Sequence, residues 1–184
     1  MNYELGNIFN QISKEVSEVC TRTDDTMAAR FADCIARAEK VFVYGNGRSG
    51  LTGKMFGMRL MHSGYDVYIV GETNTPSFSA KDLLIVISGS GKSETINNMV
   101  YKVQEIGGTS ALVTASEDQS VSEKFGCTLH LHASTKHNDI PTIQPLGNQF
   151  DQSLHLVMDA IVIYLNQKNN KTNEALKKMH FNLE

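Results

Sequence analysis

The chain has 184 residues, of which 41% are hydrophobic and 20% are charged, and its 17 Lys and Arg against 20 Asp and Glu give a net charge of −3. This length favours one domain, and the lack of a basic surplus argues against a nucleic-acid partner. The longest uninterrupted apolar run, Leu83–Ile87, is too short to span a bilayer, and the chain begins without the basic and apolar regions of a secretion signal, so we expect no membrane partner.

The first 38 residues are expected to be helical. Residues 4–38 carry apolar side chains at helical spacing, and the pair Asp24-Asp25 lies where it can end one helix and cap the next. Short runs rich in β-branched residues then alternate with helical stretches. The predicted strands are Val41–Tyr44, Val67–Val70, Leu83–Ile87, Ala111–Thr114 and Thr128–Leu131, and the predicted helices are 49–63, 93–106, 119–125, 148–167 and 172–179.

This alternation predicts an α/β fold. Short, continuously apolar strands separated by helices are typical of a parallel sheet that is covered on both faces. We therefore expect a three-layer αβα sandwich around a five-stranded parallel sheet, doubly wound as in flavodoxin. Helices over 1–38 precede the sheet, and a last helix and tail over 168–184 follow it. In such sheets, ligands bind where the strands end and the helices begin.

Two glycine- and serine-rich loops lie at predicted strand ends. Gly45-Asn46-Gly47-Arg48-Ser49-Gly50 follows the first strand, and Ser88-Gly89-Ser90-Gly91-Lys92-Ser93 follows the third. Glycine allows close approach of the backbone to a ligand, and the N–H groups at a helix start attract an anion. We expect Ser49, Ser88, Gly89, Ser90, Gly91, Lys92 and Ser93 to bind a phosphate group. Arg48 is expected to bind the attached molecule or polarise one of its oxygens.

Each loop also imitates a nucleotide motif. Gly45-x-Gly47-x-x-Gly50 satisfies the dinucleotide fingerprint, with Glu72 near the end of the next strand as the ribose-binding acid. This alternative leaves the second loop unexplained. Gly91-Lys92-Ser93 is similar to the end of a P-loop, but Val86 stands where that motif requires glycine, which argues against a nucleoside triphosphatase.

The two loops together resemble the sugar isomerase (SIS) domain, and within that family the 6-phospho-3-hexuloisomerases. The similar stretches cover essentially the whole chain, so the resemblance implies a single SIS domain over 1–184. They are Val41–Gly50, Met58-Arg-Leu-Met-His-Ser-Gly64, Val70-Gly-Glu-Thr-Asn-Thr-Pro76, Ser88–Gly91, Thr142-Ile-Gln-Pro-Leu-Gly147 and His180-Phe-Asn-Leu-Glu184.

The resemblance implies an isomerase that interconverts D-arabino-hex-3-ulose 6-phosphate and D-fructose 6-phosphate in the ribulose monophosphate route of formaldehyde fixation. It implies a phosphosugar substrate, no metal or organic cofactor, functional coupling to hexulose-6-phosphate synthase and a homo-oligomer, commonly a tetramer with sites near subunit contacts. A phosphosugar-binding SIS module without catalysis is the second alternative, and a small dinucleotide-binding protein is the third.

Three residues are candidates for the proton transfers of an isomerase. Asp151 lies where the family carries a glutamate thought to be the proton acceptor, and it alternatively only complements the helix dipole. Glu72 lies where related isomerases place an acid near the sugar, and it is alternatively a solvated loop residue. His180, in the terminal tail, is a candidate proton shuttle for its own site or that of a neighbouring subunit, and it is alternatively a structural residue. Which of Asp151 and Glu72 is the base stays open.

Other residues of metal-binding or redox type have simpler explanations. His130 and His132 alternate on a strand and share a face, but no acidic or cysteine ligand lies at a fixed spacing, so we expect no metal site. Cys20, Cys34 and Cys127 form no Cys-x-x-Cys motif, which argues against disulfides or a zinc ribbon and fits a cytoplasmic location. The methionines at helical spacing, Met55, Met58 and Met61, are expected in the core or at a subunit interface.

Overall fold

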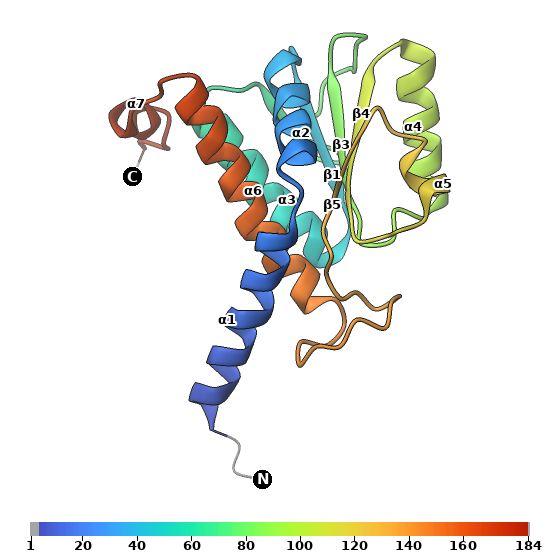
Figure 1. The fold of residues 1–184 in the computed structure, drawn as a ribbon. Helices are drawn as coiled ribbons and strands as arrows, with labels where there is room; N and C mark the ends of the chain where they lie inside the picture. Colours follow the sequence, from blue (N-terminus) through green and yellow to red (C-terminus); the bar gives the residue numbers. More distant parts are fainter. Residues whose placement is uncertain (1–3, 184) are drawn as a thin grey trace.

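Seven helices and five strands make up residues 4–183, the part of the chain that the computed structural model describes (Figure 1). Glu184, the last residue of the terminal stretch singled out above, lies outside the described residues. The strands are β1 Val41–Gly45, β2 Val67–Ile69, β3 Leu83–Ile87, β4 Thr109–Thr114 and β5 Cys127–His130. The helices are α1 Leu5–Arg22, α2 Asp25–Arg37, α3 Gly47–His62, α4 Glu94–Ile106, α5 Gln119–Ser122, α6 Asn148–Lys168 and α7 Asn173–Lys178.

The strands form one parallel sheet in the order β2-β1-β3-β4-β5. Helices α2, α3 and α6 pack on one face of this sheet, while α4 and α5 cover the other. The predicted doubly wound, three-layer αβα sandwich is therefore confirmed. Because β1 and β3 are neighbours and lead into helices on opposite faces, the chain separates at their carboxyl ends and leaves a crevice there.

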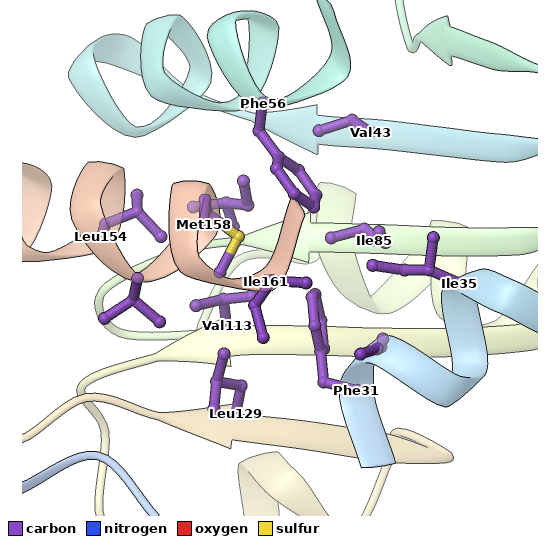
Figure 2. Packing of buried hydrophobic residues seen from close by; sticks show 14 of the residues in the cluster. Phe31, Ile35, Val43, Phe56, Ile85, Val113, Leu129, Leu154, Met158 and Ile161 are labelled. Atoms are coloured by element: carbon purple, nitrogen blue, oxygen red, sulfur yellow. The ribbon is translucent and has the colours of Figure 1, made fainter. Parts of the chain in front are cut away.

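Both faces of the central strand are buried, which explains its unbroken apolar run. Leu83, Ile85 and Ile87 point into the core beneath α2, α3 and α6, whereas Leu84 and Val86 point beneath α4. Figure 2 shows the larger core, in which Phe31 of α2, Phe56 of α3 and Met158 of α6 meet over the sheet. Burial of each such side chain contributes about 1.5–3 kcal/mol, so this packing holds the helix starts in place around the crevice.

The helix boundaries agree with the local signals in the sequence. The Asp24 carboxylate accepts a hydrogen bond from the Met27 N–H at 2.8 Å and caps α2, as predicted from the Asp24-Asp25 pair. The expected helix over 119–125 is shorter, since α5 ends at Ser122. Among residues 4–183, no helix is long and apolar enough to cross a membrane.

Helix α1 is only half packed against the rest of the chain. Val16 and Val19 are buried, but Leu5 and Phe9 lie on the amino-terminal half, which extends away from the sheet, and are 67% and 63% exposed (Figure 1). The helical spacing correctly predicted an apolar stripe, yet the outer part of that stripe has no partner within the described residues.

A buried carboxylate connects α1 to the loop that precedes α6. Glu15 is only 6% exposed and accepts hydrogen bonds from the Thr142 hydroxyl, the Ile143 N–H at 3.1 Å and the Gln144 side-chain amide at 3.0 Å. Burial alone raises the pKa of Glu15, but these bonds and one from Gln11 outweigh it and lower the pKa to about 2. Glu15 therefore stays ionised and holds residues 142–144 in place.

Replacing Glu15 with Gln should lower the free energy of unfolding by about 1–3 kcal/mol, because donors now bonded to a buried carboxylate lose a charged partner. Glu18→Gln, on the exposed side of the same helix, is the matched control and should change stability by less than about 0.5 kcal/mol. Urea unfolding at neutral pH measures both variants.

A comparison of the parent protein with Glu15→Gln also gives a pH test. The folded pKa of Glu15 is depressed, so its contribution is complete above the ordinary glutamate value of about 4.3 and is lost as pH falls toward 2. The unfolding free energies of the parent and Glu15→Gln should therefore converge between those pH values. A constant difference down to pH 2 would contradict this role.

Candidate active site

A cavity of about 290 Å³ opens at the carboxyl ends of β1 and β3. Its walls come from the ends of both strands, the starts of α3, α4 and α6, and the loop before α6. The lining residues are Tyr44, Asn46, Ser49, Ile87, Ser88, Gly89, Ser90, Lys92, Ser93, Ile96, Thr135, Lys136, His137, Leu146, Gly147, Phe150 and Asp151. The two predicted loops therefore meet in one place, at the crevice where doubly wound sheets bind ligands.

The loop after β3 presents hydroxyl groups to this cavity, and its main-chain N–H groups hold them in place. The Ser88 Oγ accepts a hydrogen bond from the Gly91 N–H at 3.0 Å, and the Ser90 Oγ accepts one from the Lys92 N–H at 3.3 Å. The Ser93 Oγ caps α4 by accepting from the Ile96 N–H at 3.1 Å. Each hydroxyl uses a lone pair in these bonds and keeps its O–H to donate, so the loop is preorganised for an anion.

This loop is anchored to the neighbouring strand. The Gly89 carbonyl accepts hydrogen bonds from the Thr114 hydroxyl at 3.1 Å and the Ala115 N–H at 3.2 Å. Gly91 does not line the cavity; it adopts a φ of +64°, and a Cβ there would overlap Val121. Its part is therefore to shape the loop, because any other residue meets both backbone strain and a steric clash.

The two basic residues that the sequence analysis assigned to the site, Lys92 and Arg48, are both engaged with carboxylates. Lys92 Nζ lies 2.9 Å from the Asp118 Oδ2, and this contact, with hydrogen bonds from Ser120, lowers the pKa of Asp118 to about 2. Arg48 Nε lies 3.5 Å from the Asp151 Oδ2, and Arg48 lines an adjoining cavity of about 490 Å³ that shares Asp151. Neither residue is a free cation facing the serine loop.

Asp151 lies in the first turn of α6, at the base of the cavity. Gly147 immediately precedes the helix with a φ of +83°, which turns the chain into α6. The Ser49 hydroxyl donates to the Asp151 Oδ1 at 2.9 Å. Asp151 is 9% exposed, and this burial raises its pKa against the opposing effects of Ser49 and Arg48. A buried carboxylate with a raised pKa in a polar cavity has the properties of a general base.

Glu72 lies outside this cavity. It follows β2 in a turn, its side chain is 49% exposed, and one carboxylate oxygen contacts Lys54 Nζ of α3 at 2.5 Å. In the described chain, Glu72 therefore has the properties of the alternative interpretation, a solvated loop residue, and it forms an ion pair with Lys54.

His180 also lies away from the cavity of its own chain. Its ring stacks on His62 with centroids 5.2 Å apart. His62 ends α3 while Ser49 lies near its start, and the rise along the helix between them is about 20 Å. The tail therefore contacts the opposite end of the domain from its own cavity (Figure 1).

The cavity is also lined by five polar residues that the sequence analysis did not propose as site residues. Tyr44 and Asn46 flank the end of β1, and Thr135, Lys136 and His137 come from the loop between β5 and α6. Tyr44 and Asn46 were detectable, since they adjoin the first glycine loop. Residues 135–137 lie in an irregular loop with no periodic pattern, so nothing local marked them.

The glycines of the first loop serve local packing. A Cβ on Gly50 would overlap the Gly45 carbonyl, and a Cβ on Gly45 would lie 3.0 Å from Gly50, so β1 and α3 approach closely only with glycine at both positions. Gly47 has a φ of +55°. The three glycines of the dinucleotide fingerprint are thus explained without a dinucleotide, and the acid of that motif, Glu72, is paired with Lys54.

The comparisons with known proteins agree with this arrangement. The SIS domain model matches residues 34–168. A 3-hexulose-6-phosphate isomerase of Bacillus subtilis is 33% identical over 183 residues, covering 98% of this chain and 97% of its own, and one of Mycobacterium gastri is 32% identical, covering 98% and 92%.

Similarity in three dimensions extends over the whole chain as well. A crystal structure from Methanococcus jannaschii, from which a function as 3-hexulose-6-phosphate isomerase was inferred, superposes with a TM-score of 0.84 at 30% identity, covering 97% of this chain and 99% of its own. The resemblance noted in the sequence is thereby confirmed: the chain belongs to the SIS domain family.

Proposed function

We propose that this protein is a cofactor-independent phosphosugar isomerase that interconverts D-arabino-hex-3-ulose 6-phosphate and D-fructose 6-phosphate. The observation that carries the proposal is the buried Asp151 carboxylate, held by Ser49, in the same cavity as a hydroxyl-rich anion loop. Full-length similarity to 3-hexulose-6-phosphate isomerases supports this substrate. We take the chain as one SIS domain, with the segments 1–38 and 168–184 as additions to it.

The serine loop binds the phosphate. Ser88, Ser90 and Ser93 donate their hydroxyl protons to phosphate oxygens, and Gly89 and Lys92 line the same wall. The positive end of α4 adds a favourable field, since the first N–H groups of a helix have no acceptor inside it. Because Lys92 is paired with Asp118, its charge is partly offset, and the attraction comes from fixed dipoles, the hydroxyls and Lys136, which lines the same cavity.

The sugar carbons then lie between this loop and Asp151. Asp151 removes the proton from C2 of the 3-ketose, and the electrons of that bond form the 2,3-enediolate, whose charge lies on the C3 oxygen. Transfer of the C2 hydroxyl proton to the C3 oxygen, and return of the proton held by Asp151 to C3, yield the 2-ketose. Nearby N–H and hydroxyl donors stabilise the oxyanion, which is where catalysis of this kind gains most.

The shorter acid is compatible with this chemistry. Asp151 stands where the family carries glutamate, one methylene longer, and a displacement of about 1 Å can cost on the order of 100-fold in rate. The bond from Ser49 and the contact with Arg48 hold the aspartate in a single position at the cavity wall. Arg48 thereby positions the base and stabilises its ionised form.

Two alternatives remain distinct in a binding experiment. A phosphosugar-sensing module would bind fructose 6-phosphate without turnover, and a dinucleotide-binding protein would bind NAD(H) instead. Titration with both ligands tests the dinucleotide-binding alternative, which predicts binding of NAD(H) and not of fructose 6-phosphate. A coupled assay separates the isomerase from the non-catalytic phosphosugar-binding module. It starts from ribulose 5-phosphate, formaldehyde and hexulose-6-phosphate synthase, and it detects glucose 6-phosphate.

The cellular setting follows from the proposed reaction. Its substrate is the product of hexulose-6-phosphate synthase, so the two enzymes would act in succession in the ribulose monophosphate route. We also propose a cytoplasmic location, which the three free cysteines, Cys20, Cys34 and Cys127, support because thiols persist in a reducing compartment.

We also propose that the protein works as a homo-oligomer, a tetramer by analogy with its family. Helices α1, α3 and α6 lie together on one side and expose large apolar side chains. These are Leu5, Ile8, Phe9, Leu51, Met55, Met58, Met61, Leu156, Ile163 and Tyr164. A second copy covering this face would also give His180 a route to the site of a neighbour, which it lacks in its own chain.

Replacing Ser90 with Ala should raise KM for fructose 6-phosphate about 10-fold to 100-fold, because a hydrogen bond to a charged group contributes roughly 1.5–3 kcal/mol. Ser122→Ala, on exposed α5 and outside the cavity, is the matched control and should leave KM unchanged. Steady-state kinetics of both variants measures the effect. Equal KM values for Ser90→Ala and Ser122→Ala would reject the phosphate assignment.

Replacing Asp151 with Asn should lower kcat by at least about 100-fold and leave fructose 6-phosphate binding nearly intact, because an amide keeps the shape but cannot accept the proton. Asp151→Glu should retain activity. Asp159→Asn, two turns along α6, is the control. Exchange of the C2 proton into heavy water measures the chemical step, and near-parental exchange in Asp151→Asn, with a larger loss in Glu72→Gln, would move the base to Glu72.

The pH profile gives an independent check on the base. Burial raises the pKa of Asp151, and a base works only when deprotonated, so kcat/KM should fall as pH drops through a value above the ordinary aspartate pKa of about 3.9. This acidic limb should be absent from the residual activity of Asp151→Asn.

Replacing Phe9 with Lys should reduce the mass of the particle in solution, measured by light scattering, because it puts a charge on the proposed interface. Tyr101→Lys is the matched control: Tyr101 is 61% exposed, close to the 63% of Phe9, but lies on α4 across the sheet. An unchanged mass for both variants would argue against this interface.

A further inference from the structure

A second cluster of polar side chains lies on the α4 and α5 side of the sheet, outside the cavity described above. Leu129 and Leu131 point into the larger core, so the alternating residues His130 and His132 point to the opposite face. Glu117, in the segment between β4 and α5, meets them there. The sequence analysis missed this acid because it is supplied by another strand end.

The three side chains converge on one point. The rings of His130 and His132 are 4.5 Å apart between centroids and stand edge to face, and His132 Nδ1 lies 3.8 Å from the Glu117 Oε1. One ligand atom from each residue lies within 4.8 Å of the other two. The His130 Nε2 is buried and has no hydrogen-bond partner in the described chain.

We propose that His130, His132 and Glu117 bind a divalent transition-metal ion, with Zn²⁺ as the preferred ion. Two imidazoles and one carboxylate are a common zinc ligand set, with a water molecule in the fourth position. Bonds of about 2.0–2.2 Å bring ligand atoms to roughly 3.3 Å from one another. Rotation of the His132 and Glu117 side chains, which are 41% and 78% exposed, provides that contraction.

A bound metal ion gives the buried His130 Nε2 a partner, whereas an ion pair between His132 and Glu117 does not. A bridge between protonated His132 and Glu117 would still leave the His130 Nε2 buried and unpaired, which is costly for a polar atom. A metal ion uses this nitrogen as a ligand and at the same time brings the exposed carboxylate into contact with it. The pair of histidines on one strand supplies the rigid part of the site, and Glu117 closes it.

The position of the cluster gives the ion a structural effect. Glu117 is followed by Asp118, which pairs with Lys92, and is preceded by Thr114 and Ala115, which bond to the Gly89 carbonyl. A metal ion would therefore tie the β4–α5 segment to the edge strand β5 and restrain the segment that supports the serine loop. Metal binding itself is independent of the isomerase proposal.

The test is a metal titration of the full chain after removal of metal with EDTA. Competition of Zn²⁺ with a chromophoric chelator should give one tight site per chain, and Co²⁺ should produce a tetrahedral absorption spectrum without thiolate bands. Glu117→Gln and His130→Gln should each weaken Zn²⁺ binding by at least about 10-fold, the scale on which even supporting groups of metal sites act. His155→Ala is the control: His155 lies on the surface of α6 beside the Asp159 carboxylate, and its loss should leave binding unchanged.

A thiol control distinguishes this site from binding at Cys34 and Cys127, which are free cysteines. Binding that is lost in Cys34→Ser and kept in Glu117→Gln would overturn the proposal, as would no binding at one equivalent of Zn²⁺. If His130→Gln does not fold, the exposed Glu117→Gln carries the test. Zn²⁺ should also raise the melting temperature of the parent but not of Glu117→Gln.

Discussion

The reversal of strand order between β1 and β3 determines where this protein can bind a ligand. Both strands are buried on both faces, so the helices that follow them must pack on opposite sides of the sheet, and their first turns separate at the carboxyl edge. Two helix starts therefore open into one crevice with their N–H groups unpaired inside the helix. The third wall is α6, which packs against α3 and brings Asp151 to within 2.9 Å of Ser49.

Two basic side chains beside the crevice form ion pairs with carboxylates. Lys92 is paired with Asp118 and Arg48 with Asp151, so in the proposed phosphate site the loop contributes fixed dipoles and hydroxyl groups, and Lys136 is a further basic side chain in the cavity. Such donors are already oriented by Ser88, Ser90 and their main-chain partners, and they cost little reorganisation when an anion arrives. Burial of Asp151 has the complementary effect, because a carboxylate that is partly desolvated takes up a proton more readily than one in water.

Much of the fold could be predicted from the sequence because burial leaves a periodic trace. Leu83–Ile87 was identified to the residue, since a strand buried on both faces is apolar at every position. The loops of the candidate site could also be located from the sequence, because the carboxyl ends of parallel strands lie at one edge of the sheet. Periodicity cannot say what covers an apolar stripe, however, and the outer half of α1 has no cover within the described chain.

The features of the candidate site that could not be predicted from the sequence depend on contacts between distant segments. Glu72 was placed at the correct edge of the sheet, but its partner Lys54 comes from α3. His180 was assigned to the tail, and only packing shows that it rests on His62. Residues 135–137 reach the cavity because the irregular loop before α6 folds back over it, and no local pattern encodes that path.

Glu15 links this loop to the proposed assembly. Its carboxylate holds residues 142–144, which run directly into Leu146 and Gly147, the left-handed pair that starts α6 below Asp151. Glu15 belongs to α1, whose outer half exposes Leu5 and Phe9. The helix whose outer half exposes an apolar surface is thus the same helix that holds the segment leading to the cavity. If a second copy covers this surface, as proposed, contacts that fix α1 also restrain the segment that precedes Asp151, the proposed base, and assembly and catalysis would then be coupled.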